Sequence, residues 1–446
     1  MKIVIAGAGE VGTYLAKMLN KDKHDIIVID IDKSKLQNMS SNYDLLTVSG
    51  SSSSIKILKD AKICSADLFI AVTERQEANI TSSILAKKLG AKRTIARVDN
   101  KEYIEVENNR IIKNLGIDSL VYPEILASNE IISLVKHSGL AKAIEFSSGM
   151  LSLFEINIDE NSPVANISLR EVIEKYDSVN ARIVAINREN KTIIPRGENR
   201  LLVGDHIFIV TNSEEVNKII SILGVKNNEL KNVIILGGSR IGVKTAKKLE
   251  NSCYVKLIEK DQQKGFDIAE ELDETLVINE LGTSAEFLIN EGIEKTDAFI
   301  AVTGNSEINI ISCLLAKKLG AKKTIAEVEN PDYLTLAKNM GIDIMINKKL
   351  IAASHIYSFT MNAEVTNVQC FTNTEAEVLE FVVHHNSKIT KKELKNIKFP
   401  QGAIIGGVVR EDSSFIATGN TQLEENDKVV VFAMPDVINK VSKLFK

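Results

Sequence analysis

The stretch KIVIAGAGEVGTYLAKML (Lys2–Leu19) decides the fold of this 446-residue chain. Apolar residues form a short strand of the buried type, a glycine-rich turn follows, and the next residues have the apolar spacing of a helix. A second stretch, NVIILGGSRIGVKTAKKL (Asn232–Leu249), repeats this order 230 residues further on. A constant offset over long stretches indicates a duplicated domain rather than an array of short repeats.

The duplication extends through both copies. ILAKKLGAKRTIARVDN (Ile84–Asn100) matches LLAKKLGAKKTIAEVEN (Leu314–Asn330), and DLFIAVTERQEANI (Asp67–Ile80) matches DAFIAVTGNSEINI (Asp297–Ile310). Strand-like and helix-like segments alternate within each copy, which is typical of a doubly wound parallel sheet. Shorter strand-like segments separated by polar turns follow each copy and predict a small α+β domain. The fold class is therefore α/β, with two tandem Rossmann-like domains that are each followed by a small α+β domain.

The length of the chain agrees with this order, since roughly 100–200 residues make one domain. An apolar segment in the second predicted connector, LIAASHIYSF (Leu350–Phe359), is either a helix that packs against another subunit or one that packs within its own chain. The predicted parts are a first Rossmann-like domain at 1–122, a helical connector at 123–142, a small domain at 143–226, a second Rossmann-like domain at 227–348, a connector at 349–366 and a second small domain at 367–446.

Composition excludes several classes of function. The chain is 44% hydrophobic and 26% charged, with a net charge of −4, so it has no basic excess for binding nucleic acid. No apolar run reaches the roughly 18 residues that a membrane-spanning helix needs. The N-terminus enters a strand at once, which indicates a folded start rather than a signal peptide. The four cysteines include no C-x-x-C pair and suit a reducing cytosol.

The first glycine turn, Gly7-Ala8-Gly9-Glu10-Val11-Gly12, fits the pattern G-x-G-x-x-G. It follows a strand and opens a helix, and Asp30 ends the next strand, which is the context of a dinucleotide-binding fingerprint. The start of the helix favours phosphates, and Asp30 favours ribose hydroxyl groups while repelling a 2′-phosphate. These residues predict an NAD-type or ATP-type ligand rather than NADP. The alternative is a glycine turn that only packs.

The second turn, Gly237-Gly238-Ser239-Arg240-Ile241-Gly242, keeps the first and last glycines of the pattern, and Glu259 stands in the place of Asp30. Ser239 replaces the middle glycine, and its side chain can either crowd a diphosphate or donate a hydrogen bond to it. Two interpretations stay open, a second nucleotide site and a degenerate copy that holds structure without a ligand.

Ligands of parallel sheets sit outside the carboxyl ends of the strands. Thr73 and Glu74 end one predicted strand of the first copy, and Thr303 ends its counterpart in the second. Arg97 ends the next strand, where a phosphate would attract it. The second copy has Glu327 there, which indicates divergence in ligand preference or occupancy. Alternatively, this position carries a solvated or interfacial charge.

The segments MKIVIAGAGEVG, VIDID, LFIAVTERQEANI and TIARVDN, together with their second copies, strongly resemble the TrkA family. These proteins are cytosolic regulatory subunits of Trk-type potassium uptake systems, built from tandem RCK (KTN) domains. The resemblance covers essentially the whole chain. It implies binding of NAD(H), or of ATP or ADP, by the Rossmann-like domains, and no enzymatic activity.

The resemblance also implies partners and a location. We expect a homo-oligomeric ring, a tetramer, in the cytoplasm and peripheral on the inner face of the cell membrane, where it gates a potassium-translocating subunit of the TrkH or TrkG type. Carried over by position, the nucleotide contacts are Gly7, Ala8, Gly9, Glu10, Val11, Gly12, Asp30, Thr73, Glu74 and Arg97 in the first copy, and Gly237, Gly238, Ser239, Arg240, Ile241, Glu259 and Thr303 in the second.

An NAD-dependent oxidoreductase is the alternative function. It needs an acid or base beside the nicotinamide, in a substrate domain. His206 lies in a predicted strand of a small domain and reads as structural, and we predict no catalytic residue and no metal site. A scaffold that binds no nucleotide is a further alternative, although it has no need of Asp30 or Arg97.

Overall fold

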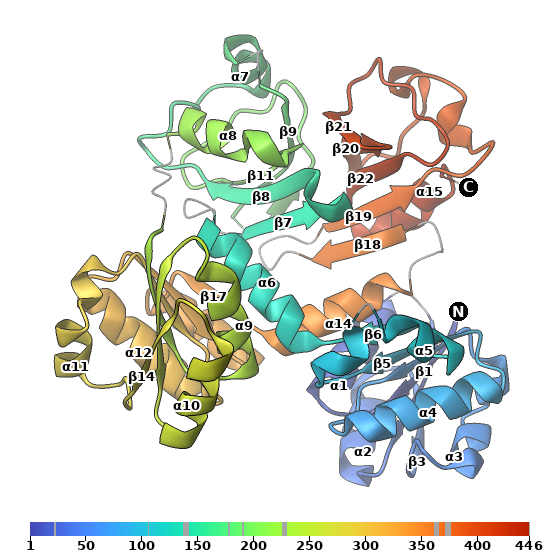
Figure 1. Ribbon diagram of the computed structural model, residues 1–446. Coiled ribbons are helices and arrows are strands. Elements are labelled where there is room, and N and C mark those ends of the chain that lie inside the picture. The colour runs from blue at the N-terminus through green and yellow to red at the C-terminus, as the bar shows by residue number, and fades with distance from the viewer. Residues whose placement is uncertain are drawn as a thin grey trace. The chain divides into compact units, whose positions relative to one another are not determined.

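The structure is a computed structural model (Figure 1). It describes residues 1–446 apart from 22–23, 106, 137–141, 177–178, 190, 225–229, 361–364, 371–375 and 446. Packing divides the chain into two units. The first unit joins Met1–Ala127 to Asn347–Thr360, and the second joins Ser128–Ile346 to Met361–Lys446.

The first unit contains a six-stranded parallel sheet with the order β3-β2-β1-β4-β5-β6. The strands are β1 (Lys2–Ala6), β2 (Asp25–Asp30), β3 (Leu46–Ser49), β4 (Leu68–Ala71), β5 (Arg93–Arg97) and β6 (Ser119–Val121). The helices that follow them are α1 (Glu10–Lys21), α2 (Lys33–Asn42), α3 (Ile55–Asp60), α4 (Gln76–Lys88) and α5 (Asn109–Asn114). The strand order reverses between β1 and β4, and ligands of such sheets bind at the carboxyl ends of strands beside that reversal.

The central strands are apolar because both faces of the sheet are covered. Ile3, Val4 and Ile5 of β1 have no exposed surface. Continuous apolar runs of this kind are characteristic of parallel strands buried on both sides.

The second unit contains a parallel sheet with the equivalent order, β14-β13-β12-β15-β16-β17. Its strands are β12 (Asn232–Leu236), β13 (Tyr254–Glu259), β14 (Leu276–Asn279), β15 (Ala298–Ala301), β16 (Lys323–Glu327) and β17 (Ile344–Ile346). Its helices are α9 (Arg240–Leu249), α10 (Gln262–Glu271), α11 (Ala285–Asn290), α12 (Ser306–Lys318) and α13 (Pro331–Asn339). The predicted fold class is confirmed, since each parallel sheet precedes a small antiparallel domain.

The antiparallel sheets of the small domains have five strands each, in the orders β10-β9-β11-β8-β7 and β18-β19-β22-β20-β21. The first small domain has β7 (Lys142–Phe146), β8 (Leu151–Asn157), α7 (Leu169–Lys175), β9 (Ala181–Arg188), β10 (Lys191–Ile193), β11 (His206–Asn212) and α8 (Val216–Ile222). The second has β18 (Val365–Cys370), β19 (Glu377–Val382), β20 (Ala403–Arg410), β21 (Ser413–Ile416), β22 (Lys428–Ala433) and α15 (Ile438–Ser442).

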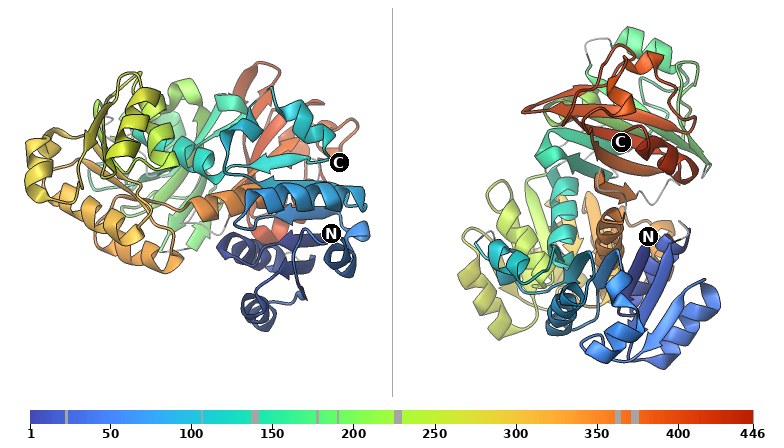
Figure 2. Two further views of the ribbon diagram at one scale, coloured as in Figure 1. Left: turned by 60° about the horizontal axis from the view of Figure 1, so that its bottom comes forward. Right: turned by 90° about the vertical axis from the view of Figure 1, so that its right-hand side faces the viewer.

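The two small domains share one hydrophobic core, and Figure 2 shows their sheets stacked. The rings of Phe208 and Phe432 lie 5.7 Å apart, centroid to centroid. A Cβ atom on Gly406 would come within 2.8 Å of the side chain of Val210, so the absence of a side chain allows the sheets to approach. The two halves of the duplication therefore join through their small domains.

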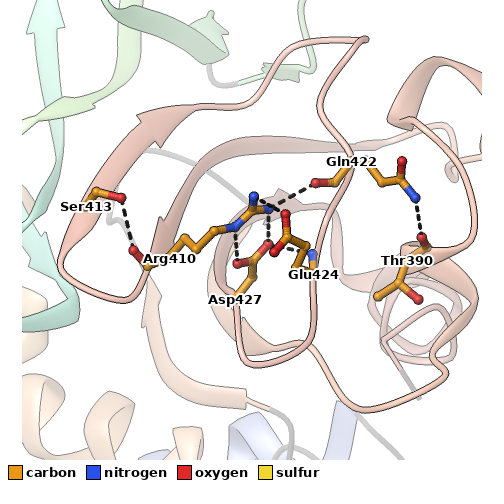
Figure 3. Close-up of polar contacts among 6 residues, drawn as sticks. All are labelled: Thr390, Arg410, Ser413, Gln422, Glu424 and Asp427. Carbon is orange, nitrogen blue, oxygen red and sulfur yellow. Dashed lines mark hydrogen bonds and ion pairs between the residues drawn. The ribbon is translucent and has the colours of Figure 1, made fainter.

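An arginine–carboxylate clamp closes the turn before the last strand of each small domain. The guanidinium of Arg410 donates two hydrogen bonds of 2.8 Å to Asp427, whose side chain is 1% exposed (Figure 3). Arg188 holds Asp205 with the same two distances in the first small domain. Paired hydrogen bonds between a guanidinium and a carboxylate combine charge with fixed geometry. The same arrangement therefore stabilises the matching turn in both small domains.

The two connecting helices are α6 (Pro123–Lys136) and α14 (Lys348–Ser358). Helix α14 follows the second parallel sheet in sequence, yet it packs on α1 in the first unit (Figure 1). Of the two packings open for Leu350–Phe359, the structure shows packing within the chain. The parts of the predicted connectors at residues 137–141 and 361–364 lie outside the described residues.

The carboxyl end of α6 is anchored in the second unit by Lys323. The Lys323 ammonium donates a hydrogen bond of 2.9 Å to the carbonyl of Leu134, one of the last carbonyl groups of a helix, which have no partner within it. Burial lowers the pKa of Lys323 to about 8, against the opposing influence of Asp343. The charged lysine therefore reduces the stability of the folded state at neutral pH.

This buried lysine predicts a particular dependence of stability on pH. In the unfolded chain the pKa of lysine is about 10.4, so between about pH 8 and pH 10 the unfolded state binds more protons and stability rises with pH. We expect the unfolding midpoint of the wild type to rise relative to that of Lys323→Met when the pH is raised from 7.5 to 9.5. Parallel pH profiles for the two proteins would contradict the lowered pKa.

Candidate nucleotide site

The first glycine turn is shaped by two backbone contacts. Gly7 has a φ of +115°, and a Cβ atom there would lie 2.9 Å from the carbonyl carbon of Val72. A Cβ atom on Gly12 would lie 1.9 Å from the carbonyl oxygen of Gly7. Gly9, in contrast, has open space on its Cβ side, with no atom within 4 Å. The turn is therefore packed at its two ends and open in the middle, where a ligand can approach the backbone.

Asp30 lies at the end of β2 against this turn. Its Oδ2 accepts a hydrogen bond of 2.6 Å from the backbone N–H of Ala8, and its Oδ1 accepts one of 2.8 Å from the N–H of Asp32. The carboxylate is half-buried and is held at the rim of the turn. Each of its oxygens can accept a further bond, as ribose hydroxyl groups require.

The ends of β4 and β5 are tied together by a buried amide, Asn79, which is 1% exposed. Its Oδ1 accepts hydrogen bonds of 2.9 and 2.6 Å from the backbone N–H and the Oγ1 of Thr73. Its Nδ2 donates to the carbonyl groups of Thr73, at 3.1 Å, and Arg97, at 3.0 Å. The sequence analysis did not identify Asn79 as a site residue. The signal was present, because Asn309 occupies the matching position of the second copy.

Arg97 ends β5 with a half-buried side chain. Within the described part of the chain, its guanidinium makes no hydrogen bond or ion pair. Glu74 is exposed beside Thr73 in the loop after β4. A cation at this edge is suited to bind a phosphate.

The residues that begin α1 differ in their surroundings. Ala8 and Val11 are buried, each 4% exposed. The N–H of Ala8 already donates to Asp30, so of these two residues Val11 is the one whose backbone N–H can serve a ligand. The Glu10 side chain is 56% exposed and pairs with Lys349 of α14 at 2.8 Å. The structure thus brings the ten predicted residues of the first copy to one edge of its sheet.

The second turn keeps the same packing. A Cβ atom on Gly242 would lie 2.1 Å from the carbonyl oxygen of Gly237, and one on Gly237 would lie 2.9 Å from the N of Thr303. The Ser239 hydroxyl accepts a hydrogen bond of 3.2 Å from the N–H of Gly242 and so caps α9. The replacement of the middle glycine therefore contributes a helix cap.

The acid of the second copy is already engaged by its own domain. The side chain of Glu259 is 7% exposed, and its Oε2 accepts hydrogen bonds from the N–H of Gly238, at 3.0 Å, and from Lys264, at 2.7 Å. Burial raises the pKa of Glu259, but the Lys264 ion pair and backbone hydrogen bonds outweigh it and hold the pKa below its usual value. Lys35 is the residue of the first copy that matches Lys264. Among the contacts of the described residues, it makes no ion pair with Asp30.

The space beside the second turn is also filled. A Cβ atom on Gly238 would lie 2.3 Å from Cδ1 of Ile268. Further along the edge, Asn309 binds Thr303 and the carbonyl of Glu327, as Asn79 binds its own partners. Glu327 is only 2% exposed, so the position matching Arg97 is not a solvated charge in the second copy. The two copies share the backbone contacts of the glycine turn and the hydrogen bonds of Asn79 and Asn309. They differ in the charge at the edge of the sheet and in the space open to a ligand beside the turn.

The described residues show neither a metal-binding cluster nor a membrane-spanning helix. They contain no group of three or more His, Cys, Asp or Glu side chains placed to hold a metal ion. None of the helices described has the length and apolar character needed to cross a membrane.

Comparison with known proteins gives matches along the whole chain. The family model described as TrkA-N domain matches residues 3–123 and 233–348, and the one described as TrkA-C domain matches residues 153–224 and 378–446. The chain is 34% identical over 454 residues to the Trk system potassium uptake protein TrkA of Haemophilus influenzae, covering 100% of this chain and 99% of that protein. It is also 34% identical over 449 residues to the Trk system potassium uptake protein TrkA homolog of Archaeoglobus fulgidus, covering 100% of each.

A solved structure, the GsuK channel bound to NAD, shares the fold. Its TM-score is 0.63 at 15% sequence identity, and the match covers 100% of this chain and 78% of that one. At this identity the likeness shows the fold alone.

Substitutions at two of the three glycines of the first turn are predicted to have unequal effects on stability. We expect Gly12→Ala to lower the free energy of unfolding by about 2 kcal/mol, because the new methyl group overlaps the Gly7 carbonyl. We expect Gly9→Ala to change it by less than about 0.5 kcal/mol, since its Cβ side is open. Urea unfolding without nucleotide measures both. Equal destabilisation by the two variants would contradict the open position of Gly9.

Proposed function

The chain belongs to the TrkA family, and from this premise we propose that it is the nucleotide-binding regulatory subunit of a Trk-type potassium transporter. The predicted resemblance is confirmed by relatives that match over the full length of the chain. The observation that carries the proposal is the open backbone at Gly9 beside the fixed carboxylate of Asp30.

The first copy offers groups for the diphosphate and for the ribose of an adenine nucleotide. The N–H groups that begin α1 attract a diphosphate through hydrogen bonds and the helix dipole. Asp30 accepts hydrogen bonds from the ribose of the adenosine and repels a 2′-phosphate. Arg97 supplies a cation at the same edge. We propose NAD(H) as the ligand, with ATP or ADP as the alternative, and the NAD-bound GsuK channel is a protein of the same fold.

The second copy is proposed as a weaker site of the same kind. A ribose that approaches Glu259 has to displace Lys264, which lies 2.7 Å from the carboxylate. Ile268 lies beside Gly238, where a diphosphate approaches in the first copy. These contacts support a division of labour in which the first copy binds nucleotide more tightly than the second does.

Nucleotide binding regulates a partner when it favours one arrangement of the protein over another. We propose that the chain forms a homo-oligomeric ring, a tetramer, in the cytoplasm, peripheral on the inner face of the cell membrane. Its partner is a potassium-translocating membrane subunit of the TrkH or TrkG type. The names of the relatives, which are potassium uptake proteins, support this assignment.

We also propose that the protein is not an enzyme. His206, the histidine considered for an oxidoreductase, lies in β11 of a small domain, and its Nδ1 is 2.8 Å from Oε1 of Glu155, which is almost fully buried. This pair belongs to an antiparallel sheet and not to the edge that holds the glycine turn. No observation favours a catalytic role for it.

The first test of the proposal is thermal unfolding with NADH, NAD, ATP, ADP and NADPH. A ligand at 100 times its Kd stabilises the folded state by about 2.7 kcal/mol. We expect an adenine nucleotide without a 2′-phosphate to raise the midpoint, and we expect Asp30→Ala or Gly9→Ala to abolish the rise. Glu259→Gln is the matched control and should keep the rise. If no nucleotide shifts the midpoint at millimolar concentration, the chain is better described as a scaffold.

The second test concerns potassium transport. We expect the chain, co-expressed with the membrane subunit from its own organism in cells that lack potassium uptake, to restore growth at low potassium. Asp30→Ala should fail to restore it, because a regulatory subunit that cannot bind nucleotide cannot switch its partner. If Asp30→Ala binds no nucleotide yet supports growth as well as the wild type, then nucleotide binding does not control uptake.

A further inference from the structure

Two helices from distant parts of the chain begin side by side at the first glycine turn. Helix α1 begins at Glu10, and α14 begins at Lys348, where Asn347 caps it through hydrogen bonds to the N–H groups of Lys349 and Leu350. The Lys349 ammonium lies 2.8 Å from Oε2 of Glu10, although the two residues are 339 positions apart in sequence. A side chain from the far end of the second repeat therefore stands at the start of the phosphate-binding helix of the first.

The charges at the start of α14 run against the helix dipole. Its first turn contains Lys348 and Lys349 and no acidic residue, whereas the N-terminus of a helix favours negative charge. Sequences that break a local rule of this kind tend to do so where function requires it. Two positive helix ends and two lysines at one place form a surface that favours an anion.

Glu10 places a negative charge at the start of α1, where a phosphate would bind. A carboxylate in the first turn of α1 stabilises the helix, but it also repels a phosphate bound at the same helix end. The Lys349 ion pair offsets that repulsion. In sequence, the matching positions of the other repeat are Arg240, for Glu10, and Glu124, for Lys349, so both signs are exchanged together. Such an exchange indicates that the two positions act as a pair.

We propose that Lys349 is a phosphate-reading residue of the first glycine turn and that it distinguishes nucleoside polyphosphates from dinucleotides. Glu10 holds the ammonium while the turn is empty or carries a dinucleotide, whose two phosphates are both esterified and carry one charge each. A terminal phosphate of ADP or ATP carries more charge and more acceptor oxygens, and it takes the ammonium from Glu10. This inference rests on the proposed nucleotide site.

The exchange has a consequence for regulation. Helix α14 belongs in sequence to the second repeat but packs in the first unit. A polyphosphate that binds Lys349 ties this helix to the ligand as well as to α1, whereas a dinucleotide leaves Lys349 paired with Glu10. The two classes of nucleotide therefore act differently on the connector between the second parallel sheet and the second small domain.

The test measures the affinities of ATP, ADP, NADH and NAD by calorimetry on the full-length protein. We expect Lys349→Met to weaken ATP binding by at least about tenfold, the effect of losing one charge-assisted hydrogen bond, and to change NADH binding by less than about threefold. We expect Glu10→Gln to tighten ATP binding, since the competing carboxylate is gone. The control is Lys17→Met, at an exposed lysine of α1 away from its first turn, which should leave the ratio of the ATP and NADH affinities unchanged.

The double variant Glu10→Gln/Lys349→Met separates a ligand role from a docking role. It carries no unpaired charge at this contact, so its unfolding midpoint without ligand should match that of the wild type, while its preference for ATP over NADH stays reduced. If Lys349→Met weakens all four nucleotides equally, or none of them, Lys349 only docks α14 and the inference is wrong. If the wild type binds no nucleotide at all, it is the proposed function that fails.

Discussion

The close contact between Gly12 and the carbonyl oxygen of Gly7 is the constraint on which the first domain depends. A single methyl group at Gly12 would lie 1.9 Å from that oxygen, and the same contact recurs at 2.1 Å between Gly242 and Gly237. Because backbone touches backbone here, α1 begins directly behind β1, at the place where the strand order reverses. The free N–H groups of the helix and the carboxylate of Asp30 then meet at one edge of the sheet, which is what a phosphate and a ribose require.

The backbone contacts of the glycine turn are the same in both copies, but the charged residues around them differ. Asn79 and Asn309 make the same set of hydrogen bonds to the ends of two neighbouring strands. Beyond them the copies differ, because Arg97 is replaced by the buried Glu327 and the second acid, Glu259, is paired with a lysine of its own domain. Packing that depends on backbone contacts tolerates such exchanges, so the same fold can carry different charges at the edge of each sheet.

The connectors make each half of the chain depend on the other. Helix α14 completes the first unit although it follows the second parallel sheet in sequence, and the carboxyl end of α6 is held by Lys323 in the second unit. The small domains add a shared core that includes Phe208 and Phe432. A change at the first glycine turn therefore acts next to a helix that precedes the second small domain in sequence.

The sequence by itself determined the local features of this protein. Apolar strands, glycine turns and the repeat predicted two parallel sheets and the loops at their edges, because each depends on residues that are close together in the chain. The sequence also predicted Asp30 and Arg97 as residues at the carboxyl ends of strands, and the structure places them at the ends of β2 and β5. Only the tertiary structure decided which charges meet. The pairing of Glu10 with Lys349 and the burial of Glu327 arise from packing between segments, and a pattern along the chain carries no record of such contacts.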